Sequence, residues 1–140
     1  MTSMQRVIHI MVVEDDVLDQ MEIRRTLERR GILHRLTIAS TGEEALDKLK
    51  ACDHAPDELP DIILLDLDLP KMNGLDVHAL LQEHRLWRKI KAFVLTGASR
   101  REEIEAAIQP GIAGIITKPL RLENRLSSDS FNLMIDLMNI

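Results

Sequence analysis

VIHIMVVEDD, at residues 7–16, is an apolar run that ends abruptly in three acidic side chains. A short and nearly continuous apolar run is typical of a strand buried on both faces, as in a parallel sheet covered by helices. We therefore expect a strand over residues 7–13, with Glu14 and Asp15 at its carboxyl end and Asp16 placed to cap the next helix. Both the fold class and the candidate site can be worked out from this segment.

Four further segments repeat the apolar pattern. They are residues 36–39, which are the weakest, IILL at 62–65, AFVL at 92–95 and IAGII at 112–116. Stretches of helical length lie between them and after the last, at residues 17–30, from Thr41 onward, 73–84, 99–109 and 128–140. Strands that alternate with helices form a parallel sheet, because each crossover carries a helix over one of its faces. The sequence predicts an α/β doubly wound domain with five parallel strands.

Local signals indicate where helices begin and which side they bury. In the first helix Ile23 and Leu27 lie four residues apart, on one face. Thr41 and Glu44, three residues apart, have the pattern of a capping box. The spacing within residues 73–84 predicts one buried face, made by Leu75, Val77, Leu80 and Leu81.

Composition narrows the possible functions. At 140 residues the chain has the length of one domain, and 45% hydrophobic with 29% charged residues suits a globular core. A formal net charge of −5 and an aromatic content of 2% argue against a broad basic or base-stacking surface for nucleic acid. No apolar run approaches the roughly 20 residues that cross a bilayer, residues 1–6 do not resemble a signal peptide, and the single cysteine suits a reducing compartment. We expect a cytoplasmic protein without a nucleic-acid or membrane partner.

Chemically active side chains follow four of the five predicted strands. They are Glu14 and Asp15 after the first strand, Asp66 after the third, Thr96 after the fourth and Lys118 after the fifth. In open α/β sheets, ligands bind outside the carboxyl ends of the strands. We therefore expect these side chains to share one edge of the sheet.

Three carboxylates in one cleft need cations. At about 5 Å and an effective dielectric constant near 20, each pair of them repels by roughly 3 kcal/mol. Lys118 supplies one positive charge, and a divalent cation such as Mg²⁺, which takes carboxylate and phosphate oxygens, supplies two more. Such a site can stabilise an incoming phosphoryl group, which one carboxylate attacks to form an acyl phosphate.

Four segments carry a resemblance to a known family. VVEDD at 12–16, LLDLDLPKMNG at 64–74, LTGAS at 95–99 and TKP at 117–119 resemble the receiver domain of two-component response regulators. The resemblance implies a flavodoxin-like sheet of strand order 2-1-3-4-5. It also implies Asp66 as the phosphoacceptor, Glu14, Asp15, Asp66 and the backbone carbonyl of Asp68 as ligands of Mg²⁺ or Mn²⁺, and Thr96, Gly97 and Lys118 around the phosphoryl group. A receiver promotes its own phosphorylation and dephosphorylation and is not a turnover enzyme.

Three positions depart from the family pattern. Ile115 stands where the family usually has an aromatic residue whose rotamer reports activation, so the aromatic half of that switch is absent. Gly97 stands where alanine is common, which leaves the site open for phosphate. Asp68 adds a carboxylate two residues beyond the acceptor. It is either a solvated loop acid or a group that tunes the lifetime of the acyl phosphate.

Apolar residues beside the predicted site suggest a partner surface. Val17, Leu18 and Met21 lie in the region with which receivers dock a histidine-phosphotransfer helix bundle, so the resemblance predicts contact with a sensor histidine kinase or a phosphotransfer protein. The alternative is that Val17 and Met21 are simply buried. DHAPDELP at 53–60, LWRKIK at 86–91 and LTGAS also resemble the small regulators that are paired with bacterial phytochromes.

The last predicted helix has more apolar residues than one buried face needs. We expect it to form a homodimer, with Phe131, Leu133, Met134, Leu137 and Met138 at the interface and with Trp87 and Phe93 adding to nearby surfaces. Because the sequence stops directly after this helix, we expect a single receiver domain over residues 1–140 with no output domain.

Two other functions compete with this interpretation. A degenerate receiver would act as an interaction scaffold that needs no phosphorylation, which the missing aromatic at Ile115 favours. A phosphatase of the haloacid dehalogenase type would use Asp66 and Asp68 as its DxD pair. That family, however, carries its second acidic pair after the lysine, whereas here the pair lies near the N-terminus.

Overall fold

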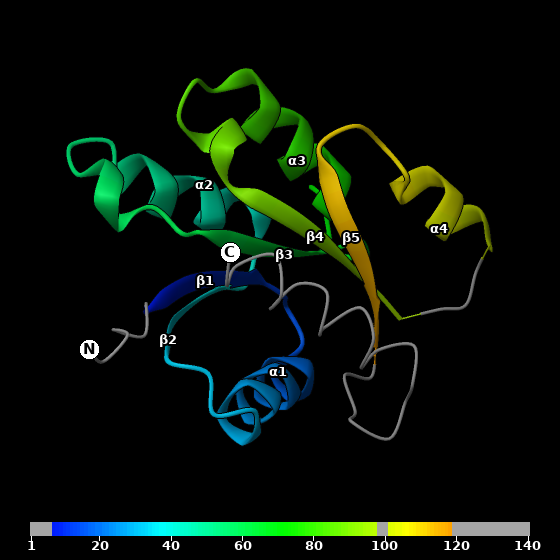
Figure 1. Cartoon of the computed structure of the whole chain (residues 1–140). Coiled ribbons are helices and arrows are strands. Elements are labelled where there is room, and N and C mark those ends of the chain that lie inside the picture. The colour runs from blue at the N-terminus through cyan, green and yellow to red at the C-terminus, as the bar shows by residue number, and fades with distance from the viewer. Residues whose placement is uncertain (1–6, 98–100, 119–140) are drawn as a thin grey trace.

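A five-stranded parallel sheet forms the centre of the molecule (Figure 1). The computed structural model describes residues 7–97 and 101–118. The strands are β1 (Ile8–Val13), β2 (His34–Ala39), β3 (Ile62–Asp66), β4 (Lys91–Thr96) and β5 (Ile112–Thr117), and the helices are α1 (Val17–Arg29), α2 (Gly42–Ala51), α3 (Gly74–Glu83) and α4 (Arg101–Ala107), with short 3-10 turns η1 (Pro56–Glu58) and η2 (Trp87–Lys89). The order β2-β1-β3-β4-β5 confirms the predicted doubly wound topology.

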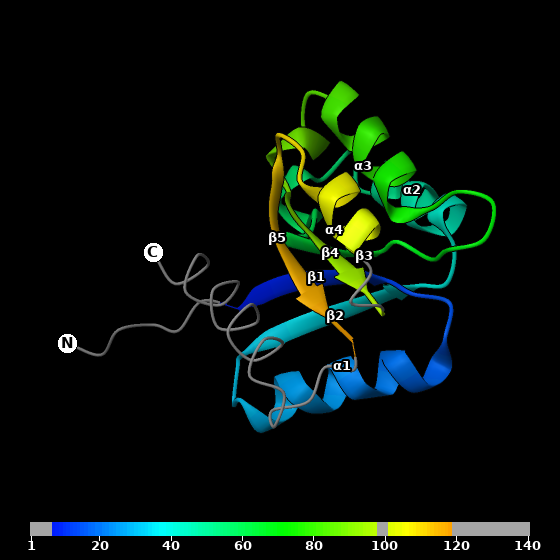
Figure 2. The same ribbon diagram turned by 90° about the vertical axis from the view of Figure 1, so that its right-hand side faces the viewer.

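Helices cover both faces of this sheet. Figure 2 shows α1 on one side and α2 and α3 on the other. Ile23 and Leu27 of α1 belong to one buried cluster, with Ile10, Leu64 and Phe93 from the strands. The opposite cluster contains Ala45 and Leu49 of α2 and Val77 and Leu81 of α3. Alternate residues of each central strand therefore enter different cores, which explains why the strands read as continuous apolar runs.

The register of the strands brings their carboxyl ends together. Val13 at the end of β1 pairs with Ala39 of β2 and with Leu65 of β3. Asp66 pairs with Leu95, next to Thr96, the last residue of β4. The side chains that follow these strands consequently meet at one edge of the sheet.

Helix caps are largely those that the sequence predicts. Asp16 caps α1, and its side chain accepts a hydrogen bond from the Asp19 N–H at 3.0 Å. Thr41 caps α2, and its hydroxyl group accepts a hydrogen bond from the Glu44 N–H. In a capping box the Glu44 carboxylate would accept from the Thr41 N–H, but here it accepts from the Ser40 N–H at 3.2 Å, one residue earlier. The complete capping box lies at the start of α3.

The structure corrects several predictions about burial and length. Leu80 is 38% exposed, and its predicted place on the inner face of α3 is taken by the buried His78. Phe93 is buried and adds to no surface, and Trp87 is largely buried and only lines a pocket beside Leu80 and His84. The helix α4 ends at Ala107, two residues before the predicted end.

Some predictions are not addressed by this part of the structure. The predicted helix of residues 128–140 lies outside the described residues. Within residues 7–97 and 101–118, the helices are too short or too polar to cross a membrane.

Candidate functional site

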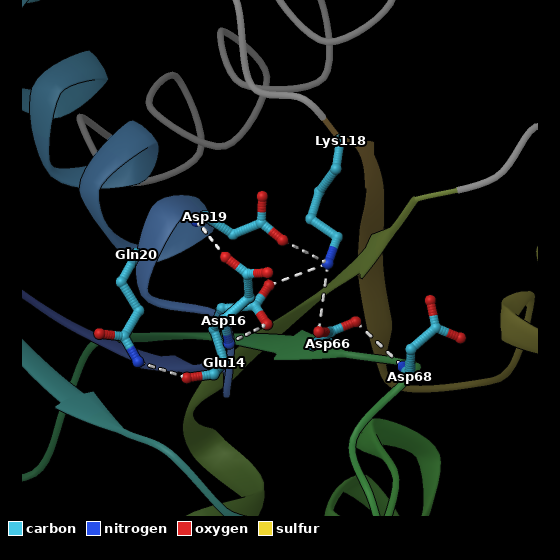
Figure 3. A network of polar contacts seen from close by, with 7 residues as sticks. All are labelled: Glu14, Asp16, Asp19, Gln20, Asp66, Asp68 and Lys118. Carbon is cyan, nitrogen blue, oxygen red and sulfur yellow. Dashed lines mark hydrogen bonds and ion pairs between the residues drawn. The ribbon is translucent and has the colours of Figure 1, made fainter.

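The predicted side chains converge at the carboxyl edge of the sheet (Figure 3). Glu14 follows β1 directly, Asp66 is the last residue of β3, Thr96 is the last of β4, and Lys118 follows β5. Backbone hydrogen bonds continue the ladder past the strands, from the Glu14 N–H to the Ala39 carbonyl at 2.9 Å and from the Lys118 N–H to the Thr96 carbonyl at 2.7 Å. The side chains are thus carried by backbone that is hydrogen-bonded to the neighbouring strands.

Three carboxylates form the acidic part of the site. Glu14, Asp15 and Asp66 each place an oxygen within 4.8 Å of the others. Glu14 and Asp66 are buried, while Asp15 is exposed. Two buried carboxylates this close together can be accommodated only with cations or protons beside them.

Lys118 is the cation that reaches the buried acids. Its Nζ lies 2.9 Å from Glu14 Oε1, 3.2 Å from Asp66 Oδ2 and 3.1 Å from Asp19 Oδ2 (Figure 3). Its side chain is 13% exposed. One ammonium group therefore shares its three N–H donors among three carboxylates.

The pKa values of Glu14 and Lys118 indicate that the single positive charge of Lys118 does not balance the negative charge of the buried acids. Burial and the hydrogen bond with the Asp66 carboxyl raise the pKa of Glu14 to about 8, although hydrogen bonds from Lys118 and from the Asp16 N–H act in the opposite direction. Burial by itself would lower the pKa of Lys118, but the hydrogen bond to Glu14 and the charges of Asp66 and Glu14 outweigh it and raise that pKa above its usual value. The raised pKa of Glu14 indicates that Lys118 alone does not supply enough positive charge for the buried acids, and a bound cation would add to it.

Hydrogen bonds hold the two buried acids in place. The second Asp66 oxygen, Oδ1, accepts from the Asp68 N–H at 3.0 Å, and Glu14 Oε2 accepts from the Asp16 N–H at 3.1 Å. The Gln20 side-chain amide donates to the Glu14 carbonyl at 2.6 Å. One oxygen of each acid therefore faces Lys118 while the other is bound to the backbone of the following loop.

Two glycines border the site under different constraints. A Cβ atom on Gly74 would lie 2.6 Å from the Asp66 carbonyl oxygen, so only glycine lets the start of α3 approach the end of β3 this closely. A Cβ on Gly97 would meet Lys118 Cε at 3.6 Å, an ordinary contact. Gly74 is sterically required here, whereas Gly97 is not.

The donor set of the cluster fits a hard divalent cation. All three candidate side-chain ligands are carboxylates, and oxygen is the ligand that Mg²⁺ and Mn²⁺ prefer. A softer metal would be expected to have thiolate or imidazole ligands. The one side-chain ammonium in contact with the buried acids, within the described residues, leaves negative charge for such an ion to neutralise.

The remaining predicted residues are distributed around this cluster. Thr96 is buried at the end of β4, and Asp68 and Gly97 are exposed in the adjoining loops. Ile115 is half-buried within β5. The interface residues predicted in the last helix, Phe131, Leu133, Met134, Leu137 and Met138, lie outside the described residues.

Val17, Leu18 and Met21 are exposed on α1 by 64%, 70% and 41%. The alternative that Val17 and Met21 are buried is therefore wrong. These three residues form an apolar patch on the first turns of α1, in the same turns that supply Asp19 and Gln20 to the site. We call them the α1 patch below.

Two side chains of the site were missed by sequence analysis. Asp19 contacts Lys118, and Gln20 binds the Glu14 carbonyl. Asp19 is the third residue of a helix that starts at Val17, so it lies in the first turn, close to the end of β1, and this short spacing from the acids after β1 is visible in the sequence. That spacing is the signal that could have identified it.

Comparisons with known proteins agree with this geometry. A family model, that of the response regulator receiver domain, matches residues 10–128. The probable methanogenesis regulatory protein FilR2 of Methanothrix harundinacea is 32% identical over 115 residues, which is 82% of this chain and 74% of FilR2. The matched residues 10–128 include all of the strand-end side chains described above.

Three solved structures have the same fold. A two-component response regulator from Legionella pneumophila has a TM-score of 0.76 and 29% identity, covering 95% of this chain and 99% of its own. The bacteriophytochrome response regulator AtBRR has a TM-score of 0.74 and 26% identity over 96% and 91% of the two chains. The Mn(2+)-bound form of the response regulator Rcp1 has a TM-score of 0.69 and 26% identity over 94% and 92%.

Proposed function

The chain belongs to the response regulator receiver domain family, and from this premise we propose that it accepts a phosphoryl group on Asp66. The observation that carries the proposal is the position of the Asp66 carboxylate. It is buried at the end of β3, held by the Asp68 N–H, and contacted by Lys118 Nζ at 3.2 Å. A carboxylate placed among cations in this way can act as a nucleophile toward phosphorus.

The donor is a phosphohistidine of a sensor histidine kinase or of a phosphotransfer protein. A carboxylate oxygen of Asp66 attacks the phosphorus atom, the P–N bond to imidazole breaks, and the imidazole nitrogen keeps the electron pair. The product is an acyl phosphate. Thr96 ends β4 and Lys118 follows β5 at the same edge of the sheet, and in this proposal both bind the phosphoryl oxygens.

Glu14, Asp15 and Asp66, with the backbone carbonyl of Asp68, would hold Mg²⁺ or Mn²⁺. When bound, the ion neutralises charge on the acids and on the phosphoryl oxygens. The burial of Glu14 and Asp66 supports this role, because a charge in a site of low dielectric constant acts more strongly than one in water. The Mn(2+)-bound form of Rcp1 is a relative of the same fold.

The α1 patch is the surface that we propose for the phosphodonor protein. It is apolar and exposed, and it lies on the turns of α1 that border the site. Since AtBRR is a bacteriophytochrome response regulator, a phytochrome-type kinase is one candidate donor. Replacing Leu18 with Asp should slow phosphotransfer from the kinase about tenfold and leave labelling by acetyl phosphate unchanged. Equal loss of both reactions would contradict the docking role.

Signalling by this protein would then depend on changed protein contacts, with turnover limited to its own phosphorylation and dephosphorylation. Homodimerisation through the last helix and a cytoplasmic location stay predictions. The scaffold alternative has only Ile115 in its favour, and the phosphatase alternative lacks its later acidic pair.

The decisive experiment is intact-mass measurement after incubation with acetyl phosphate, with and without Mg²⁺. Wild type should gain one phosphoryl group only with Mg²⁺, and Asp66→Asn should gain none. Asp61→Asn is the matched control, because Asp61 directly precedes the opposite end of β3, and it should still be labelled. No gain in a folded wild type would favour the scaffold, whereas repeated release of phosphate would favour the phosphatase.

A further inference from the structure

Lys118 is held by a carboxylate that the chemistry of phosphoryl transfer does not need. Asp19 Oδ2 lies 3.1 Å from Lys118 Nζ, between the 2.9 Å and 3.2 Å contacts that Lys118 makes with Glu14 and Asp66 (Figure 3). Glu14 and Asp66 come from the ends of β1 and β3, whereas Asp19 reaches in from the first turn of α1. Its side chain is 30% exposed, so it contacts Lys118 from the solvent side.

This contact competes with the role that Lys118 has in the phosphorylated protein. An ammonium group has three N–H donors, and here carboxylates occupy all of them. A phosphoryl group on Asp66 brings three new acceptor oxygens. The N–H of Lys118 that now points to Asp66 Oδ2 can turn to one of them, and Lys118 can bind a second only by leaving another partner. Asp19 is the most exposed of the three partners, so its contact with Lys118 is the least costly to give up, because water can replace it.

We propose that Asp19 is a positioning residue that holds Lys118 in the unphosphorylated protein and releases it when Asp66 carries a phosphoryl group. The inference rests on the proposed function, since it concerns how the same site changes state. Asp19 thereby biases the site toward its unphosphorylated form, because the Asp19–Lys118 contact exists only there.

The position of Asp19 also connects this exchange to the α1 patch. Asp19 follows Leu18 directly and lies two residues before Met21. The same turn is tied to the site by the Gln20 amide and by the Asp16 N–H, both of which donate to Glu14. A phosphodonor that contacts the α1 patch therefore contacts the turn that carries Asp19, the residue that binds Lys118.

The test uses beryllium trifluoride with Mg²⁺ as a probe, because it binds an aspartate carboxylate as a phosphoryl analogue without covalent turnover. The concentration for half-saturation is measured by ¹⁹F NMR in wild type and in Asp19→Ala, Asp19→Asn and Asp19→Glu. Loss of the contact in Asp19→Ala should tighten binding about two- to fivefold, the value of a partly exposed ion pair. Asp19→Glu keeps the charge and should stay near wild type, and Asp19→Asn should lie between them. Glu28→Ala removes an exposed charge from the same helix and should change nothing.

A second readout follows Lys118 itself. The ¹³Cε signal of Lys118, assigned by its loss in Lys118→Gln, should move in probe-free Asp19→Ala toward its position in probe-bound wild type. Tighter binding without this shift would mean simple charge repulsion and would overturn the proposal, as would unchanged binding in Asp19→Ala. Failure of wild type itself to bind the probe would instead refute the proposed function, so the two failures are distinguishable.

Discussion

The two ends of the sheet place acidic and basic side chains next to each other under opposite conditions. At the amino end, Asp61 Oδ2 accepts from the His9 N–H at 2.9 Å and the Arg35 guanidinium contacts His9 Nδ1 at 3.1 Å, and all three residues are at least partly exposed. At the carboxyl end, Glu14 and Asp66 are buried beside a single lysine.

The difference in burial between the two ends distinguishes charged groups that stabilise the fold from charged groups that serve function. Exposed groups that bind backbone or one another at moderate cost hold strands together. Two buried carboxylates with one ammonium are held at a cost to stability, which a protein retains for function. The following predictions test this contrast, from the largest expected effect to the smallest.

Mg²⁺ should stabilise the protein through the carboxyl end alone. At a concentration about 100 times its Kd, one bound ion adds about 2.7 kcal/mol to the free energy of unfolding. Urea unfolding with and without Mg²⁺ measures this gain. Asp66→Asn should lose most of it and Asp61→Asn should keep it. An equal gain in both variants would place the ion elsewhere.

Gly74→Ala should destabilise the protein by about 2 kcal/mol. The added methyl group would lie 2.6 Å from the Asp66 carbonyl oxygen, which forces α3 and β3 apart. Gly97→Ala is the matched control, because its methyl group meets Lys118 Cε at an ordinary 3.6 Å. Thermal unfolding of the two variants compares them, and equal stability would show that the close approach carries no constraint.

Asp66→Asn should raise the free energy of unfolding in the absence of metal, by about 1 kcal/mol, because it removes the buried charge whose proximity helps to raise the pKa of Glu14. The same change at the other end, Asp61→Asn, should lower it by a similar amount, because Asp61 accepts the His9 N–H as a charged partner. Chemical unfolding in EDTA measures both changes. Shifts of the same sign would remove the distinction between the two ends.

The amino end should contribute a small pH dependence. Burial and the charge of Arg35 lower the pKa of His9, against the Asp61 carboxylate and the nearby backbone carbonyls of Glu58 and Leu59. Below its ordinary pKa of about 6.5 the unfolded chain binds a proton at His9 that the folded protein resists, so the contribution of His9 to stability falls as the pH drops from 7.5 to 5.5.

The size of this effect should be a few tenths of a kcal/mol, because the ring is only half-buried. Relative to wild type, His9→Gln should gain stability as the pH falls over this range, as measured by urea unfolding of both proteins. A relative loss of stability in the variant would mean that His9 stabilises the acidic form of the protein.

Much of the fold could be predicted because local pattern and topology agree. Strands buried on both faces must be apolar throughout, so the apolar runs at residues 62–65 and 92–95 predicted strands. The helical segments between the strands predicted that the sheet is parallel. The weaker β2 was recognised only in part, and its first residues, His34 and Arg35, are polar because they lie partly exposed at the sheet edge.

Burial on the helices was harder to predict. Leu80 and His78 are both compatible with the periodicity of α3, and the packing of neighbouring elements decides which faces inward. The same holds for Trp87, which is covered although a single aromatic in a polar stretch gives no periodic signal. Hydrophobicity alone does not specify which apolar residues find a partner surface.

The sequence by itself determined the fold class and the identity of the acids, the hydroxyl group and the lysine at the strand ends, because parallel strands bring residues that follow apolar runs to one edge, and the family resemblance supplied the strand order. Only the tertiary structure decided that Asp19 shares Lys118 with Glu14 and Asp66, that Gly74 must lack a side chain, and that the α1 patch is exposed. These facts depend on distances between elements far apart in the chain. Such distances are fixed by packing, which no local pattern of residues records.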